Sequence, residues 1–209
     1  MKRLLHERRL AALVMLAAGL LLPGLSPRVW AGGCPNLLRN GSFELGPNGD
    51  WSETSLGGNE LITTDWAHGG QYAAYLGGSD DADDTLSQVV TIPSDAGSVT
   101  LTYWWAINTL EDTHPHDRCT VELRATDDAL LQTLETIVDT DDVVAYDWQR
   151  CDVDLTAYRG RQVKLVFHAV TDSSSPTEFF IDDVALTTCQ APAPGSHALY
   201  LPLALRPAP

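Results

Sequence analysis

Three carboxylates lie in short motifs at the two ends of one β-rich stretch, and they are the side chains best placed for metal chemistry. Glu44 closes the motif Asn40–Glu44, and Asp182 and Asp183 lie in the motif Phe179–Val184. If the strands carrying the two motifs are neighbours, Glu44 and Asp182 can converge. Calcium takes six to eight oxygen ligands and accepts carboxylates as well as backbone carbonyls. The pattern favours a calcium ion at this junction.

The turn His68–Gln71 would supply carbonyls, because its two glycines let the backbone approach closely. Asp182 and Asp183 leave alternatives open. In an alternating strand one of them points inward, and a buried unpaired carboxylate is costly. An ion or an arginine partner would offset that cost; otherwise the pair has a structural hydrogen-bonding role or is a solvated acidic pair.

Aromatic side chains form a second group, because sugar recognition stacks rings on pyranose faces and places polar groups at the hydroxyls. Trp104 and Trp105 are adjacent in an expected strand, so their indoles face opposite sides. We expect one in the core and the other on the second face, where an exposed indole indicates a binding platform. Asn108 and Arg124 are its expected hydrogen-bonding neighbours. The wider set of candidate rings is Trp51, Trp66, Trp104, Trp105, Tyr146 and Trp148.

Other polar clusters give weaker signals. The run Asp80–Asp84 would bind a second cation, although such runs are more often solvated loops. The run Glu111–Asp117 holds two histidines and three carboxylates, residue types of a transition-metal site. The sequence contains no nucleophile elbow, zinc-protease motif or phosphate loop. This pattern favours a binding protein over an enzyme.

Short strands must position these residues. Helical periodicity is nearly absent, and runs of β-forming residues recur between clusters of Gly, Pro, Asp and Ser. Residues 34–189 suffice for one domain with a core of its own. We therefore expect an all-β sandwich. Its expected strands are 37–44, 71–76, 85–92, 99–108, 119–125, 131–137, 148–155, 162–170 and 178–187.

The N-terminal segment predicts export. Four basic residues precede an apolar run over 10–22, and Val29–Ala31 suits cleavage after Ala31. The run is shorter than the roughly 20 apolar residues of a spanning helix; a membrane anchor, a lipoprotein at Cys34 and twin-arginine export are weaker alternatives. Residues 1–31 are a predicted signal peptide. The mature chain would carry 8 basic and 27 acidic side chains, because the leader holds five of the 13 basic and one of the 28 acidic residues. That charge disfavours nucleic acid as a partner.

Four cysteines in an exported chain predict two disulfides, with three possible pairings. Cys34 and Cys189 lie just outside the two end motifs and would close a sandwich whose first and last strands are side by side. That leaves Cys119 with Cys151.

The C-terminal end divides into two segments. Residues 190–196 predict a stiff, extended linker, because they combine Pro and Ala. Residues 197–209 are an apolar tail too short to span a bilayer. Their string Leu199–Leu203 resembles a tail of exported proteins of filamentous bacteria, so the segment is either a frayed end or a sorting or docking tag.

Six short motifs occur in a fixed order over nearly all of residues 36–187: Asn40–Glu44, Trp51, His68–Ala74, Gln88–Pro93, Val153–Gly160 and Phe180–Val184. This series resembles the galactose-binding-like jelly rolls, the group that holds many carbohydrate-binding modules and MAM-type domains. It also resembles modules appended to secreted bacterial peptidases and glycosidases. The ordered set is more specific for the fold than for the ligand.

The resemblance implies a jelly-roll β-sandwich of two antiparallel sheets, spanning residues 32–189, with a structural calcium ion. The side chains of Glu44 and Asp182 and a carbonyl near Gly69 would bind the ion, and Ser42 would add an oxygen. The common turn of the family reads His-Ser-Gly. This chain has Gly69 at the serine position, so a side-chain ligand is not available there.

Together these patterns predict a secreted, non-catalytic module that binds an extracellular glycan and is stabilised by calcium. The alternative is a structural or adhesive cell-surface domain with a protein partner, anchored by its C-terminal tail.

Overall fold

The computed structural model describes residues 33–109, 116–139 and 145–190. The predicted signal peptide, the tail, all but the first residue of the linker, and most of the Glu111–Asp117 run lie outside the described residues. Within the described part, no helix is long and apolar enough to cross a membrane.

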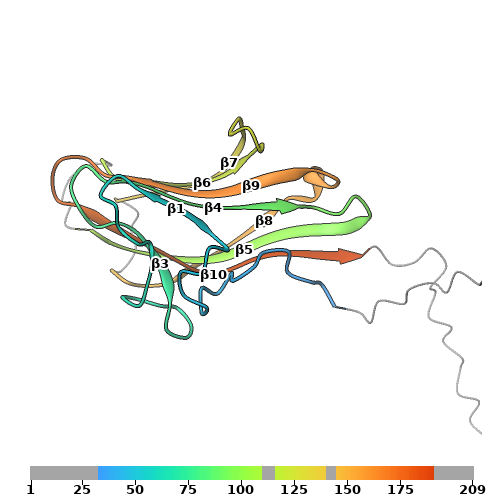
Figure 1. Cartoon of the computed structure of the whole chain (residues 1–209), viewed down its shortest axis with the longest axis horizontal. Helices are drawn as coiled ribbons and strands as arrows, with labels where there is room; N and C mark the ends of the chain where they lie inside the picture. The colour runs from blue at the N-terminus through green and yellow to red at the C-terminus, as the bar shows by residue number, and fades with distance from the viewer. Residues whose placement is uncertain (1–32, 110–115, 140–144, 191–209) are drawn as a thin grey trace, which may run out of the picture. The chain divides into compact units, whose positions relative to one another are not determined.

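Two antiparallel five-stranded sheets lie face to face and form the predicted jelly-roll sandwich (Figure 1). One sheet, the β4/β9 sheet, has the order β1-β4-β9-β6-β7, and the other, the β5/β10 sheet, has the order β2-β3-β10-β5-β8. The strands are β1 (Ser52–Ser55), β2 (Ile62–Thr63), β3 (Ala73–Gly77), β4 (Asp83–Thr91), β5 (Ala96–Thr109), β6 (Arg118–Arg124), β7 (Leu130–Val138), β8 (Gln149–Asp154), β9 (Gln162–Val170) and β10 (Thr177–Gln190). A single 3-10 turn, η1 (Thr156–Tyr158), precedes β9.

Apolar side chains on the inner faces of the strands fill the space between the sheets. In β9, Leu165 and Phe167 are fully buried, while their neighbour Lys164 is only partly buried. Each buried residue of this size contributes about 1.5–3 kcal/mol of hydrophobic stabilisation. Trp51 joins the same core, with its ring 6.2 Å from that of Phe167. Trp51 is therefore a core residue and cannot stack on a ligand at the surface.

The first predicted strand, over 37–44, is wrong. Asn36 makes an isolated bridge to Thr187, and the chain then turns instead of extending. Asn40 and Phe43 have φ values of 46° and 57°, in the left-handed region that interrupts a strand. The Asn40 side chain holds the turn, because its Oδ1 accepts a hydrogen bond from the Leu45 amide at 3.1 Å. The other eight predicted strands correspond to β3 to β10.

The disulfide between Cys34 and Cys189 is confirmed, with Cα atoms 4.4 Å apart. The pairing of Cys119 with Cys151 is wrong in this structure, where both are free thiols. They lie on β6 and β8, in opposite sheets: Cys119 is fully buried in the core, whereas Cys151 is only partly buried and lies beside Tyr103 of β5 in the sheet register. Burial raises the pKa of the Cys119 thiol to about 12.

Candidate functional site

The outer face of the β5/β10 sheet carries aromatic side chains, which is unusual for a surface facing away from the core. On β10, Phe179 and Ile181 belong to the core, so Phe180 between them points outward. Phe180 is nevertheless only 2 % exposed. Tyr75 of β3, its partner in the sheet register, stacks against it with ring centroids 5.2 Å apart. Something other than the core must therefore cover this face.

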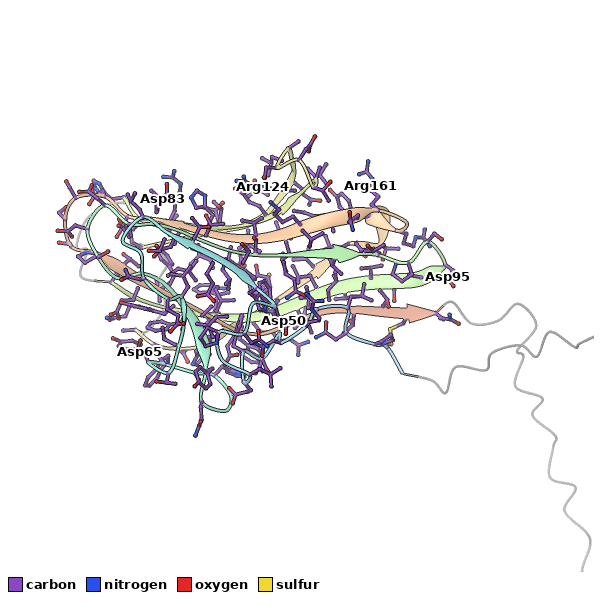
Figure 2. The ribbon with its side chains drawn as sticks, viewed as in Figure 1. Asp50, Asp65, Asp83, Asp95, Arg124 and Arg161 are labelled. Atoms are coloured by element: carbon purple, nitrogen blue, oxygen red, sulfur yellow. A yellow bond between two sulfur atoms is a disulfide. The ribbon has the colours of Figure 1, made fainter. Side chains whose placement is uncertain are left out.

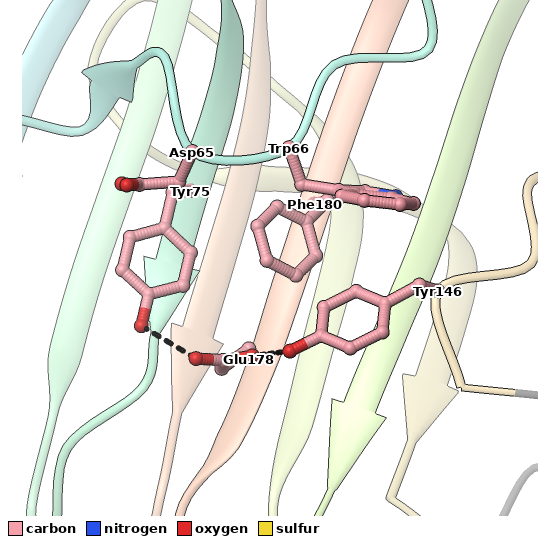
Figure 3. A pocket seen from close by; sticks show the side chains of 6 residues that line it. All are labelled: Asp65, Trp66, Tyr75, Tyr146, Glu178 and Phe180. Atoms are coloured by element: carbon pink, nitrogen blue, oxygen red, sulfur yellow. Dashed lines mark hydrogen bonds between the residues drawn. The ribbon is translucent and has the colours of Figure 1, made fainter.

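Two loops supply the cover and leave a pocket of about 480 Å³ between them (Figure 3). Trp66, from the segment between β2 and β3, and Tyr146, from the segment before β8, stand 5.0 Å apart by ring centroid. Tyr146 also lies 5.8 Å from Phe180. Trp66 is 43 % exposed and Tyr146 is 36 % exposed, so rings remain open to solvent at the mouth. We call this the aromatic pocket; it is lined by Asp65, Trp66, Tyr75, Tyr146, Glu178 and Phe180.

Glu178 is the polar centre of the aromatic pocket. Its carboxylate accepts hydrogen bonds from the hydroxyls of Tyr75 at 3.2 Å and Tyr146 at 2.9 Å, as Figure 3 shows, and from Asn108 Nδ2 at 2.9 Å. All three donors are neutral. The carboxylate therefore fixes the two tyrosine rings that flank the pocket while its charge is not matched by an ion pair among the described residues.

The same carboxylate changes the acidity of both tyrosines. Burial, followed by the charge of Glu178, raises the pKa of Tyr75 well above its ordinary value. The hydrogen bond to Glu178 raises the pKa of Tyr146 as well. Both hydroxyls therefore stay protonated as donors to Glu178 at neutral pH, and neither is prepared to act as a base or nucleophile.

A second aromatic group lies on the same face, around His68. The imidazole stacks on Trp104 with centroids 4.1 Å apart and meets the edge of Trp148 at 5.4 Å. His68 Nδ1 lies 2.7 Å from Asp183 Oδ2, which orients the ring. Trp104 is thus the outward-facing member of the tryptophan pair, but His68 covers its face, so it is not the open platform that the sequence suggested.

The predicted metal ligands Glu44 and Asp182 both bind the turn at residues 68–72. Glu44 accepts hydrogen bonds from the amides of Gln71 at 2.9 Å and Tyr72 at 2.9 Å. Gly70 is required for this approach, because its φ is +69° and a Cβ there would lie 2.2 Å from the Glu44 carboxyl carbon. Glu44, from the first end motif, therefore holds the C-terminal half of this turn through its backbone amides.

Asp182 is completely buried, yet it does not enter the core. Its Oδ2 accepts hydrogen bonds from the amides of His68 at 2.9 Å and Gly69 at 3.0 Å, and burial raises its pKa to about 6. The strand does not alternate here: Asp183 has φ +48° and the register with β5 shifts between Asp182 and Ala185. This bulge turns both acids toward one turn, which corrects the expectation that one of them points inward.

The residues around this turn are compatible with calcium but do not form a dense ligand cluster. Ser42, Glu44 and Asp183 line one hollow of about 420 Å³. Within the described residues, no group of three or more His, Cys, Asp or Glu side chains is arranged to hold a metal ion. A calcium ion here would thus depend on backbone carbonyls for most of its oxygens, which calcium accepts.

The other predicted ligand-binding residues divide between the two sheets. Asn108 lies at the base of the aromatic pocket, through its bond to Glu178. Trp105 is 8 % exposed and belongs to the core, so it is not part of a platform. Arg124 lies on β6 of the opposite sheet and pairs with Glu122 at 2.5 Å. Figure 2 shows Arg124 and Asp65 on opposite sides of the sandwich, so Arg124 cannot neighbour this pocket.

The acidic runs have structural roles where they are described. Asp84 is buried and accepts a hydrogen bond from the Gly77 amide at 2.9 Å, and Asp83 pairs with His168 at 2.8 Å. Asp117, the last residue of the second run, is buried and accepts hydrogen bonds from the amides of Asp172 and Thr177. In both runs, the described carboxylates thus hold neighbouring segments in place by hydrogen bonds and ion pairs.

Sequence reasoning named Trp66 and Tyr146 only among wider candidates and missed Tyr75, Glu178 and Phe180. One signal was available. Phe179 and Phe180 are adjacent in a strand, so one of them had to face outward, as the same argument held for Trp104 and Trp105. The loops that cover Phe180 have no such periodic signal.

No protein-family profile matches the chain, and no curated protein matches its sequence. Solved structures do resemble it. The carbohydrate-binding module TmCBM61, solved in complex with β-1,4-galactotriose, superposes with a TM-score of 0.53 at 18% identity over 73% of this chain and 97% of that chain. The K3 cleaved adhesin domain of Lys-gingipain from Porphyromonas gingivalis does so with a TM-score of 0.52 at 19% identity over 74% and 99%. This likeness confirms the β-sandwich fold that the motifs predicted.

Proposed function

We propose that this chain is a non-catalytic module that binds an extracellular glycan in the aromatic pocket on the outer face of the β5/β10 sheet. One observation carries the proposal: Trp66 and Tyr146 present partly exposed rings, 5.0 Å apart, beside a fixed carboxylate. Exposed rings supply the stacking surface for a pyranose, and Glu178 supplies an acceptor for its hydroxyls. Binding sites are concave and largely preformed, with few polar groups that fix orientation, as this pocket is.

The fold likeness to TmCBM61, a module solved with a bound galactotriose, agrees with the proposal without identifying the sugar. The geometry supports binding more than catalysis. Glycoside hydrolysis needs a pair of carboxyl groups, one of them a proton donor. In the pocket, Glu178 already accepts three hydrogen bonds from neutral donors, which commits it to the role of an acceptor.

Calcium belongs to the proposal as a structural element. Glu44 and Asp182 would hold it together with a carbonyl near Gly69, and Ser42 would add an oxygen. The support is the burial of Asp182 without an ion-pair partner among the described residues. The cation would offset the cost of that buried charge and would fix the turn that carries Trp66 and His68. Secretion is part of the same proposal and depends on the predicted leader and the disulfide of Cys34 with Cys189.

A second candidate is an adhesive surface domain with a protein partner. The likeness to the K3 adhesin domain of Lys-gingipain favours it, because the same sandwich serves in a protein of that description. The aromatic pocket would then receive a protein side chain instead of a sugar.

A glycan array probed with the purified full chain, with calcium present, tests the proposal. We expect a coherent set of related glycans that Trp66→Ala no longer binds. A blank array from folded protein would contradict glycan binding and favour the adhesive candidate. Matched binding by wild type and Trp66→Ala would place the sugar somewhere other than this pocket.

A further inference from the structure

We propose that the aromatic pocket selects sugars that carry a protonated amine, so that its preferred glycan contains amino sugars with a free ammonium group. This inference rests on the proposed function, since it names the class of glycan. It starts from the charge of the pocket. Among the described residues, the ionisable ones that line it are Asp65, Tyr75, Tyr146 and Glu178, and none of the lining residues is basic.

The Glu178 carboxylate is anchored but not neutralised. Its three hydrogen bonds come from two hydroxyls and one amide, all of which are uncharged. Some strand carboxylates among the described residues do have an arginine partner: Glu122 pairs with Arg124, and Asp152 pairs with Arg150. Glu178 has no such partner, so a cationic group of a ligand can take that place beside its carboxylate. A charge-assisted hydrogen bond to an ammonium group is about twice as strong as a neutral one.

The rings around Glu178 suit the same group. An ammonium ion is attracted to the faces of aromatic rings when it lies within about 6 Å of their centroids. Phe180 packs against Tyr75 at 5.2 Å and Tyr146 at 5.8 Å, so no ion fits between these rings, and an ammonium ion beside Glu178 instead meets the partly exposed rings of Trp66 and Tyr146. Figure 3 shows Tyr75 and Tyr146 on either side, with Trp66 opposite Glu178. Aromatic faces and a carboxylate together favour a cation that has its own apolar substituents, such as an amine on a sugar ring.

The same features disfavour acidic glycans. A uronate or a sulfate needs hydrogen-bond donors, and both tyrosine hydroxyls of the pocket are already directed to Glu178. Two acidic side chains, Asp65 and Glu178, would also repel it. Neutral sugars can stack on the rings but gain nothing from the charge, so they rank between the two classes.

One rival explanation must be separated from this one. The chain has a formal net charge of −15, so any polycation is attracted to it without a specific site. A long-range effect of that kind depends on the total charge, whereas the proposed selection depends on Glu178. Asp95 provides the matched control, because it is an exposed acid on the turn between β4 and β5 and lies at the far end of the sandwich from Asp65 (Figure 2).

The experiment compares three β-1,4-linked hexamers that differ only at C2: glucose (hydroxyl), N-acetylglucosamine (neutral amide) and glucosamine (ammonium). Binding to the full chain is measured by calorimetry at a mildly acidic pH and at moderate salt. We expect the glucosamine hexamer to bind about tenfold more tightly than the other two. Glu178→Gln should remove most of the preference for glucosamine over the two neutral hexamers, because the ammonium group then loses its charged partner. Asp95→Asn should change none of the three affinities.

Three results would overturn the inference. If the three hexamers bind equally and Trp66→Ala abolishes binding of all three, the proposed function stands and the amine selection is wrong. If Asp95→Asn weakens glucosamine binding as much as Glu178→Gln does, the attraction is non-specific. If none of the sugars binds but tetramethylammonium binds and Trp66→Ala removes it, the ammonium chemistry is right, while the amino-sugar assignment and the proposed function both fail.

Discussion

The two outer faces of the sandwich belong to sheets of equal strand number, yet the hollows on them differ in how their charged side chains are paired. The β4/β9 sheet has a hollow lined by hydroxyls and charged side chains, in which Lys164 pairs with Asp128 at 2.5 Å and His168 with Asp83 at 2.8 Å. The β5/β10 sheet has rings and a carboxylate without a cationic partner. Burial alone therefore does not identify a binding site. The aromatic pocket is the better candidate because the charge of Glu178 has no cationic partner within the described protein.

The largest effect should come from the disulfide, which fixes the β5/β10 sheet and has no counterpart in the β4/β9 sheet. Breaking the bridge of Cys34 with Cys189 frees a loop spanning 155 residues in sequence, and the free energy of unfolding should fall by about 4 kcal/mol. Thermal unfolding with and without dithiothreitol measures this. In the Cys34→Ser/Cys189→Ser variant, dithiothreitol should have no further effect. A further decrease there would show that Cys119 and Cys151 pair after all.

The second largest effect should come from Asp182, the buried acid of the β5/β10 sheet, and should appear in the pH dependence of stability. Burial raises the pKa of Asp182 to about 6 from an unfolded value of about 3.9. The folded state therefore binds more protons between these values, so stability should decrease as pH rises from about 4 to 7, by about 2 kcal/mol in EDTA. Urea unfolding across this range measures it.

Calcium should reverse that trend, because it stabilises the ionised carboxylate and binds only the folded state. A melting temperature at pH 7 that is the same in calcium and in EDTA would contradict the calcium proposal and leave the amide hydrogen bonds of Asp182 as its whole function.

The third prediction tests the rings directly. Trp66→Ala should weaken glycan binding at least tenfold, about 1.4 kcal/mol, while it changes the free energy of unfolding little, because the ring is 43 % exposed. Calorimetry with a glycan identified on the array measures the affinity. Trp148→Ala, a neighbouring ring that packs on His68, serves as the control and should keep more of the affinity. The reverse order would move the site toward His68.

The smallest effect should come from the opposite face. Arg124→Gln should leave glycan affinity unchanged and lower the free energy of unfolding by less than about 1 kcal/mol, because Arg124 is partly solvated and its partner Glu122 also contacts Thr120. The same calorimetric titration and urea unfolding measure both quantities. A loss of affinity would show that the β4/β9 face takes part in binding.

The fold was predictable from sequence because it depends on periodicity. Alternation in 162–170 and the pairing of end motifs required two packed sheets, and the jelly-roll motifs ordered them. The predicted strand over 37–44 failed for a local reason, the left-handed residues Asn40 and Phe43. A single residue with a left-handed backbone conformation does not alter the alternation of apolar and polar residues from which strands are predicted.

The site was predictable only in part. Glu44 and Asp182 were expected near the turn that begins at His68, and each accepts a hydrogen bond from a backbone amide of that turn. The aromatic pocket depends instead on where two loops fold back over β10. The contacts of Tyr146 with Trp66 and Phe180 arise from tertiary structure. The sequence therefore identified two of these rings as candidates but could not predict that they lie together.

The bond between Cys34 and Cys189 also has a mechanical consequence. Their Cα atoms are 4.4 Å apart, so the polypeptide enters and leaves the domain at a single point. Phe180 lies nine residues earlier on the same strand, about 30 Å away along an extended chain. A force applied to either end of the described domain therefore enters at this covalent bridge and bypasses most of the hydrogen bonds that join the strands, with the aromatic pocket well away from the point of attachment.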